Sequence, residues 1–189
     1  MASHDDILRR VQLLAGLATA WSGTLYRNSR VRFANEADLL TGTGSRQHGG
    51  RWNPKGIAAV YASLTPEAAM AEALSQFRYY GWNIAHAMPR LFVAIDVSLE
   101  RVLDLTQGSI RQRLGVSAQR MVADDWRKIQ WAGAVSLTQM IGQAAATAGL
   151  EGLLVPCPSD PASKNLVWFP GNLGRGAKIV VQKADELPK

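Results

Sequence analysis

The first twenty residues show the spacing of an amphipathic helix. From about residue 5 to residue 20, apolar side chains recur every three or four positions, at Ile7, Leu8, Val11, Leu14 and Leu17. This spacing places them on one face of a helix. Acidic Asp5 and Asp6 favour a helix start, because negative charge is stabilised at a helix N-terminus. The pattern predicts a helix over about 5–20 whose role is packing.

Short apolar runs further along the chain predict strands. The runs are rich in β-branched and aliphatic residues and cover 24–28, 58–63, 91–97, 101–105, 153–156, 166–169 and 178–181. Between the first two, a polar, glycine-dotted segment from about Asn35 to Gly56 predicts a loop. A loop of this length indicates either function or disorder.

Helix signals separate the strands. Thr65, Pro66 and Glu67 predict a helix start, and this helix is expected to reach about Tyr80. Residues 109–131 predict helix interrupted near Gly115, and residues 136–148 predict a helix that begins at a serine cap. Strands and helices do not alternate regularly. We therefore expect a single α+β domain with small mixed sheets and flanking helices rather than a doubly wound parallel sheet.

Composition limits the classes of protein and site. A chain of 189 residues with 47% hydrophobic residues fits one globular domain. No apolar run approaches the roughly 20 residues that span a bilayer, so we expect a cytoplasmic protein without membrane contact. Cys157 is the only cysteine, and His4, His48 and His86 are scattered. We therefore expect neither an intramolecular disulfide nor a metal site.

Positive charge is concentrated near the front of the chain. The formal net charge is +6, and residues 24–56 hold six basic side chains against Glu36 and Asp38. Such a field favours nucleotide phosphates, nucleic acid or an acidic protein as partner. The standard glycine-rich nucleotide loops are missing, so any nucleotide must be held in another way.

The densest group of candidate residues is the segment Gly49–Gly56. Its glycines allow a close backbone approach, and the guanidinium of Arg51 suits diphosphate oxygens. The structural alternative is a surface hairpin in which Trp52 packs on the core and Arg51 is only solvated.

Three further candidates each have a structural alternative. Arg27 lies in a strand context and taken alone is a surface charge or a structural ion-pair partner. Glu72 lies opposite the apolar stripe of its helix, where Ala68 would leave room for a ligand, although an exposed helix acid is the simpler interpretation. Tyr61 is either a core aromatic or a platform for a ring.

A proline-rich turn over 155–166 offers hydroxyls, amides and backbone N–H groups that suit a phosphate. Neither Ser159 nor Ser163 has a histidine neighbour in sequence, and Cys157 lacks an activating partner. A serine or cysteine hydrolase is therefore disfavoured.

Taken in order, these motifs resemble the RES domain family, named for an arginine, a glutamate and a serine. The matching residues span about 25–181 and are Arg27, Gly50-Arg51-Trp52-Asn53 with Gly56, Tyr61-Ala62-Ser63, Glu72, and Asn165-Leu166 leading to Phe169. The resemblance implies a catalytic domain over 24–189 that follows a helical extension over 1–23. For the serine position Ser159 is favoured, then Cys157, then Ser163.

The resemblance implies an ADP-ribosyltransferase-like fold and a toxin-type enzyme that cleaves the nicotinamide-ribose bond of NAD. The acceptor would be phosphate, as co-substrate, or water; no prosthetic group is implied, and an antitoxin partner would cover the site. The implied catalytic residues are Arg27, Glu72 and Ser159. The implied binding residues are Arg51, Trp52, Tyr61, Ser63, Cys157 and Asn165.

Two alternatives remain open. The chain could transfer ADP-ribose from NAD to a protein, or it could be a non-catalytic basic module that binds nucleic acid. The basic residues are interspersed with acids and glycines rather than forming a lysine-rich stripe. This pattern favours an enzyme over direct binding of nucleic acid.

Overall fold

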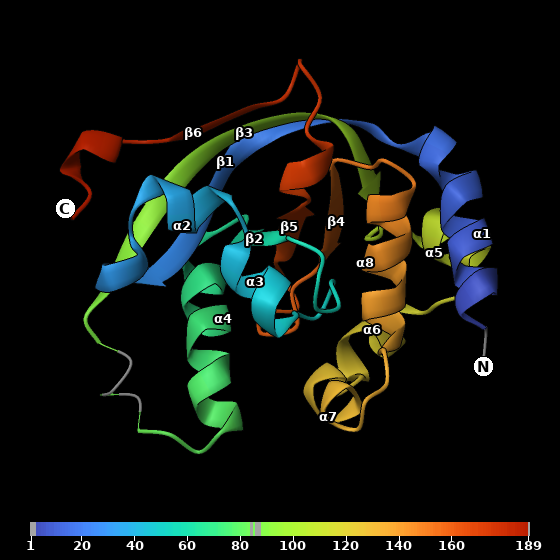
Figure 1. The fold of residues 1–189 in the computed structure, drawn as a ribbon, viewed down its shortest axis with the longest axis horizontal. Coiled ribbons are helices and arrows are strands. Elements are labelled where there is room, and N and C mark those ends of the chain that lie inside the picture. The colour runs from blue at the N-terminus through green and yellow to red at the C-terminus, as the bar shows by residue number, and fades with distance from the viewer. Residues whose placement is uncertain (1–2, 84, 86–87, 189) are drawn as a thin grey trace.

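The computed structural model describes residues 3–83, 85 and 88–188, with no side-chain description at residue 76. His86 lies outside these residues. A mixed six-stranded sheet has the order β1-β2-β5-β4-β3-β6, and β1 also pairs with β3 (Figure 1). The short strands expected from the sequence thus join in one sheet, and the expected α+β class is confirmed. The strands are β1 (Thr19–Arg30), β2 (Val60–Ser63), β3 (Arg90–Asp104), β4 (Gly152–Pro156), β5 (Lys164–Trp168) and β6 (Lys178–Val181).

The antiparallel pair of β1 and β3 is the longest feature of the sheet. Arg27 lies opposite Val93 in this ladder. The sequence predicted two strands, over 91–97 and 101–105, where the structure has one. Alternate burial continues through Val97 and Leu99, so the polar Ser98 between them points to the other face and does not end the strand.

The N-terminal helix is shorter than predicted and belongs to the main core. Helix α1 (His4–Leu14) is followed by a single 3₁₀ turn, and β1 already begins at Thr19, ahead of the boundary expected at residue 23. Helix α1 packs against α8 (Leu137–Thr147). Ile7 and Val11 are fully buried there.

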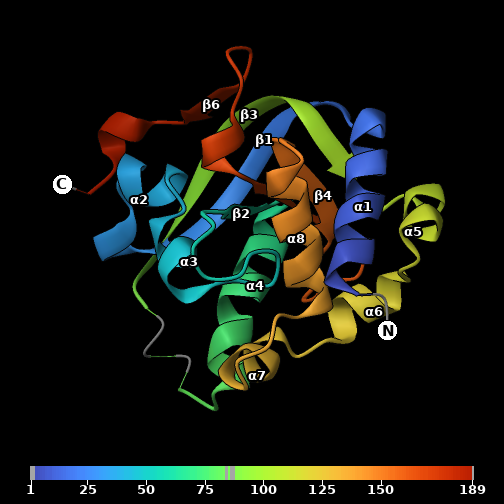
Figure 2. The ribbon, with the colours of Figure 1, turned by 45° about the vertical axis from the view of Figure 1, so that its right-hand side comes forward.

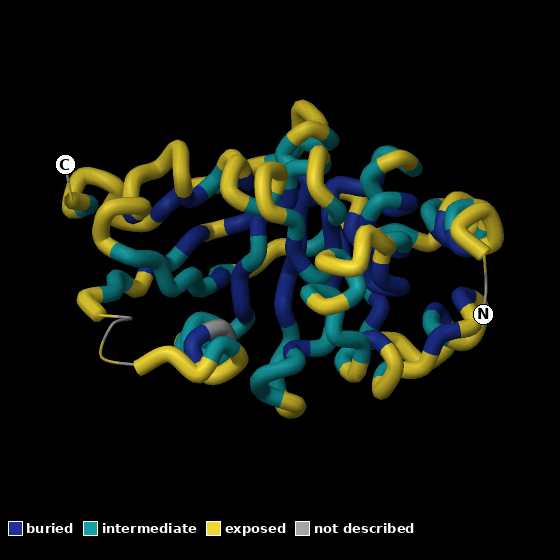
Figure 3. Tube along the Cα trace, turned by 60° about the horizontal axis from the view of Figure 1, so that its bottom comes forward, coloured by how far each residue is buried: buried dark blue, intermediate teal, exposed yellow. Residues whose placement is uncertain are grey.

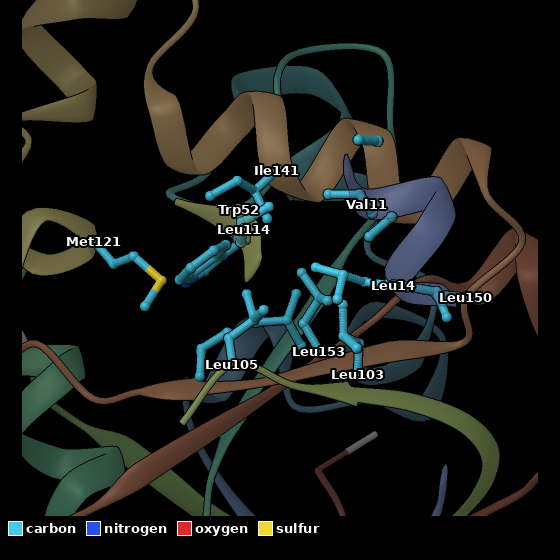
Figure 4. Packing of buried hydrophobic residues seen from close by; sticks show 14 of the residues in the cluster. Val11, Leu14, Trp52, Leu103, Leu105, Leu114, Met121, Ile141, Leu150 and Leu153 are labelled. Atoms are coloured by element: carbon cyan, nitrogen blue, oxygen red, sulfur yellow. The ribbon is translucent and has the colours of Figure 1, made fainter. Parts of the chain in front are cut away.

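Apolar side chains fill both faces of the sheet. Successive residues of β4 belong to different clusters, Leu153 to one and Leu154 to the other, as strand alternation requires. The first cluster lies beneath α1 and α8 and includes Trp52 and Ile141 (Figure 4). Buried residues occupy the centre of the molecule and exposed residues its outside (Figure 3).

The prediction of a loop over 35–56 is wrong, because this segment contains two short helices. These are α2 (Glu36–Leu40) and α3 (Thr43–His48). The side chain of Asn35 caps α2 by accepting a hydrogen bond from the Asp38 N–H at 2.9 Å, and Leu39 is fully buried. The helices were missed because each is too short for its apolar residues to show a period.

The remaining helices follow the predicted pattern. Helix α4 (Pro66–Tyr79) ends close to the expected residue. The region 109–131 divides into α5 (Gly108–Leu114), α6 (Ala118–Ala123) and α7 (Trp126–Trp131), with Gly115 at a φ of 75° after α5. Among the described helices, none combines the length and apolar content that crossing a bilayer requires.

Close packing of α8 on the segment that holds Trp52 gives a first prediction. Gly142 is buried, and a Cβ added to it would overlap the carbonyl oxygen of Trp52. Gly142→Ala is expected to lower the free energy of unfolding by about 1–3 kcal/mol or more, although alanine favours helix. Thermal unfolding measures the effect. Gly16→Ala is the control, since nothing lies within 4 Å of its added Cβ; equal losses in the two variants would contradict the prediction.

Candidate functional site

A cavity of about 740 Å³ opens between the sheet, α4 and the α6–α7 region. This volume suits a nucleotide-sized ligand. Its only charged lining residues in the described part of the chain are Arg27, Arg51, Arg90, Arg127 and Glu72. Four guanidinium groups against one carboxylate leave an excess of three positive charges. Such a lining favours an anionic ligand.

Glu72 supplies the one carboxylate. It lies on α4 with Ala69, one turn earlier on the same face, and with the adjacent Ala73, and both alanines also line the cavity. Their small side chains leave space beside the carboxylate. Ala68, which the sequence suggested would make this room, is instead fully buried. Ala68 and Ala69 differ by one position around the axis of α4, and this rotation decides which of them faces the cavity.

Three donors hold one oxygen of Glu72. Its Oε1 accepts hydrogen bonds from Cys157 Sγ at 3.2 Å, the Ser159 backbone N–H at 3.3 Å and Asn165 Nδ2 at 3.3 Å. All three donors come from the hairpin of β4 and β5. Within the described residues Oε2 accepts no hydrogen bond. The carboxylate is therefore fixed in orientation with one oxygen free.

The turn between β4 and β5 separates the three candidates for the serine position. Ser159 lines the cavity. Cys157 is buried, with 2% of its surface exposed, and touches Glu72 from behind. Burial, and after it the charge of Glu72, raises the pKa of Cys157 to about 12. The Ser163 hydroxyl is buried without a partner among the described residues and is not in the lining.

A buried hydrogen-bond chain shapes the arginine-bearing loop. The hydroxyl of Tyr61 accepts from the Trp52 N–H at 2.9 Å and donates to Asn53 Oδ1 at 2.6 Å. Asn53 Nδ2 in turn donates to the carbonyls of Ser45 and Ile57 at 2.9 and 2.8 Å. Burial raises the pKa of Tyr61, so the phenol stays protonated. The organising role of Asn53 was not recognised in the sequence.

Trp52 and Ser63 both line the cavity, Trp52 from the hydrophobic core and Ser63 from the end of a strand. The side chain of Trp52 is buried in the core, which matches its structural interpretation, although the residue is part of the lining. Ser63 lies at the end of β2, is 3% exposed and also lines the cavity, as does Tyr61. Asn165 faces Ser63 in the ladder of β2 and β5.

Arg51 is held by main-chain carbonyls rather than by an acid. Its Nη1 donates to the carbonyls of Met121 and Asp124, both at 3.1 Å, at the end of α6. Burial lowers the pKa of Arg51, Glu72 raises it and Arg127 lowers it. The guanidinium remains charged, because arginine is protonated at all ordinary pH values.

Arg27 on β1 and Arg90 on β3 also line the cavity. The guanidinium of Arg27 donates to the Leu39 carbonyl, and burial lowers the pKa of Arg27 to about 10. Arg90 donates to the Asn28 carbonyl at 2.9 Å. Strands β1 and β3 bring these two arginines together from distant parts of the sequence. Strand pairing therefore assembles the part of the cationic lining that Arg27 and Arg90 form.

The structure thus brings the predicted site residues to the cavity except Cys157, which contacts Glu72 from outside the lining, and Ser163, the third candidate for the serine position. Sequence reasoning missed several lining residues, because they lie outside the motifs: Tyr26, Asn28, Ser45, Ser75, Tyr79, Arg90, Trp126 and Arg127. Within the described chain, no three His, Cys, Asp or Glu side chains gather as a metal site would require.

Comparison with known proteins gives the family. The model of the RES domain matches residues 24–188. The NAD(+) phosphorylase MbcT of Mycobacterium bovis and that of Mycobacterium tuberculosis are each 34% identical over 140 residues, which cover 72% of this chain and 68% of the relative. The crystal structure of the M. tuberculosis MbcT–MbcA toxin–antitoxin complex has the same fold, with a TM-score of 0.72, 24% identity and 97% of both chains covered. This chain belongs to the RES domain family.

Proposed function

We propose that this chain cleaves the nicotinamide-ribose bond of NAD and transfers the ADP-ribosyl group to inorganic phosphate. The observation that carries the proposal is the Glu72 carboxylate, fixed by three donors in a cavity whose other charged residues are arginines. The relatives named NAD(+) phosphorylase support the same reaction.

Glu72 acts on the reacting sugar. When the bond to nicotinamide breaks, its electron pair goes to the pyridine nitrogen, and positive charge develops on the ribose. A carboxylate oriented toward that charge stabilises the transition state more than the ground state. The free Oε2 of Glu72 is suited to this task, while Oε1 stays with its donors. A phosphate oxygen then bonds to the anomeric carbon, and nicotinamide leaves neutral.

The arginines bind the negative charges of the two substrates. Arg27 and Arg51 each use one nitrogen to anchor to backbone carbonyls. The remaining N–H groups of a guanidinium suit phosphate oxygens. The excess positive charge of the lining is complementary to the diphosphate of NAD together with inorganic phosphate.

The polar residues around Glu72 complete the site. Ser159 fills the serine position of the family and, with Asn165, contacts the phosphate. Tyr61 positions the nicotinamide or the ribose with its ring, since its hydroxyl is committed to Trp52 and Asn53. Ser63 lies in the same lining and contacts the substrate there.

The proposal includes a partner and a place of action. The toxin–antitoxin complex of similar fold supports an antitoxin that covers the cavity and restrains the enzyme. We place the enzyme in the cytoplasm, where its substrate NAD is available. The kinship of this fold with ADP-ribosyltransferases is part of the same proposal.

The role of Glu72 is testable with a matched pair of variants on α4. Glu72→Gln keeps the size of the side chain but removes its charge, so nicotinamide release from NAD is expected to fall by about 10²–10³-fold. Glu67→Gln makes the same change at an exposed position in the first turn and is expected to leave activity unchanged. Chromatographic assay of nicotinamide measures both rates. Activity of Glu72→Gln within about twofold of the unsubstituted chain would remove the carboxylate from the mechanism.

The acceptor is identified by the product. With phosphate present, the expected product is ADP-ribose phosphorylated at the anomeric carbon, and its yield should match the nicotinamide released. Mass spectrometry of the small-molecule fraction distinguishes it from free ADP-ribose. Free ADP-ribose at a rate independent of phosphate would indicate hydrolysis, and ADP-ribose attached to protein would indicate transfer to a protein.

The thiol of Cys157 is expected to be inert. With a pKa near 12, only roughly 10⁻⁴ of the thiol is ionised at pH 8, and the thiolate is the reactive form. Treatment of the folded protein with N-ethylmaleimide at pH 8 should leave Cys157 unmodified by mass and leave nicotinamide release intact. Denaturation should restore rapid modification. Rapid modification of the folded chain with loss of activity would point to a nucleophilic thiol.

A further inference from the structure

Arg127 lies in the cavity lining with its guanidinium against two aromatic rings. Its Cζ is 4.5 Å from the ring centroid of Trp126 and 5.0 Å from that of Tyr79. Trp126 begins α7, whereas Tyr79 ends α4. Figure 2 shows α7 beside the lower end of α4. The two rings come from separate helices and hold one cation between neighbouring elements.

A carboxylate fixes the ring of Tyr79. The Tyr79 hydroxyl lies 2.9 and 3.1 Å from the two carboxylate oxygens of Asp125. Asp125 also caps α7 by accepting from the Lys128 backbone N–H at 3.2 Å. The nearest acid in sequence is therefore occupied by the phenol and the helix end. It forms no ion pair with Arg127 in the described chain, where the ion pairs are Lys128–Asp125 and Lys183–Glu186.

The N–H groups of Arg127 differ from those of the other cavity arginines. Arg27, Arg51 and Arg90 each donate to backbone carbonyls. Among the described residues, the Arg127 guanidinium donates no hydrogen bond. It also lies close enough to Arg51 to lower the pKa of that residue. Two neighbouring cations with free N–H groups favour an anion between them.

We propose that Arg127 binds a phosphate group of the substrates, either the diphosphate of NAD or the incoming inorganic phosphate. The identity of the two substrates rests on the proposed function, whereas the contact itself rests on the geometry of Arg127. The guanidinium lies beside two rings and donates no hydrogen bond among the described residues, so its planar fork remains available to phosphate oxygens. Because the rings hold the side chain in place, less conformational freedom is lost when the anion binds. Arg127 is thus a binding residue that the family motifs do not include.

Calorimetric titration of the whole chain tests the contact without catalysis. ADP-ribose reports on the diphosphate, and inorganic phosphate reports on the second source. Arg127→Gln is expected to weaken binding of one probe by about 10–100-fold, the range for a lost charge-assisted hydrogen bond. The probe that is affected identifies the phosphate group. Arg120→Gln makes the same change at an exposed position on α6 and is expected to leave both affinities unchanged.

A second variant and two separate measurements distinguish failure of the anion contact from failure of the proposed reaction. Arg127→Lys keeps the charge without the planar fork and is expected to weaken the same probe by a smaller factor; it carries the test if thermal unfolding shows that Arg127→Gln does not fold. Both probes bound within twofold of the unsubstituted chain, or neither probe bound by that chain, would overturn the proposal. Binding of a probe without nicotinamide release from NAD would instead defeat the proposed reaction while the anion contact stands.

Discussion

The arginines that line the cavity must be partly buried without losing their positive charge to a neighbouring acid. A buried guanidinium is costly unless its N–H groups find acceptors. In this protein the acceptors are neutral oxygens: the carbonyl of Leu39 for Arg27, those of Met121 and Asp124 for Arg51, and the carbonyl and side-chain oxygens of Asn28 for Arg90. Carbonyl dipoles satisfy the donors but leave the charge in place. Carboxylates in the same positions would have formed ion pairs and removed the attraction for an anionic ligand.

The single carboxylate follows the same rule with the opposite sign of charge. Glu72 is held by neutral donors on the hairpin of β4 and β5, so its negative charge is retained beside the arginines. Asn165 lies in the central strand β5, whereas Cys157 and Ser159 lie in the turn that joins the buried strands β4 and β5. Likewise, the loop that bears Arg51 is tied to the sheet by Tyr61 and Asn53. A site of this kind has its charges placed before substrate arrives, which is how electrostatic stabilisation avoids reorganisation during the reaction.

The α6–α7 region extends the site beyond the residues that resemble the family pattern. The C-terminal end of α6 anchors Arg51, and α7 carries Arg127 and Trp126. The ring of Tyr79 connects this region to α4 through Asp125. One side of the cavity is therefore formed by the sheet and α4, and the other by short helices. Ligand contacts from both sides would link the reacting sugar to the phosphate groups.

The sequence by itself determined the elements whose signals are local. Thr65 and Pro66 marked the start of α4, Gly115 marked the end of α5, and Ser136 marked the start of α8. Caps and helical periods act over a few residues, so they can be recognised without a fold. The ordered motifs likewise indicated the family and several of the residues that line the cavity.

Only the tertiary structure decided what depends on distant segments. Pairing of β1 with β3 brought Arg90 to the same cavity as Arg27, and the β4–β5 hairpin placed Ser159 in the lining and Cys157 behind Glu72. Side-chain convergence of this kind depends on which strands pair and on how each helix packs on the sheet. Contacts between distant segments set both, and the local period of apolar residues does not reveal them. The same reason explains why the ring-held cation of α7 was not apparent from its neighbours in sequence.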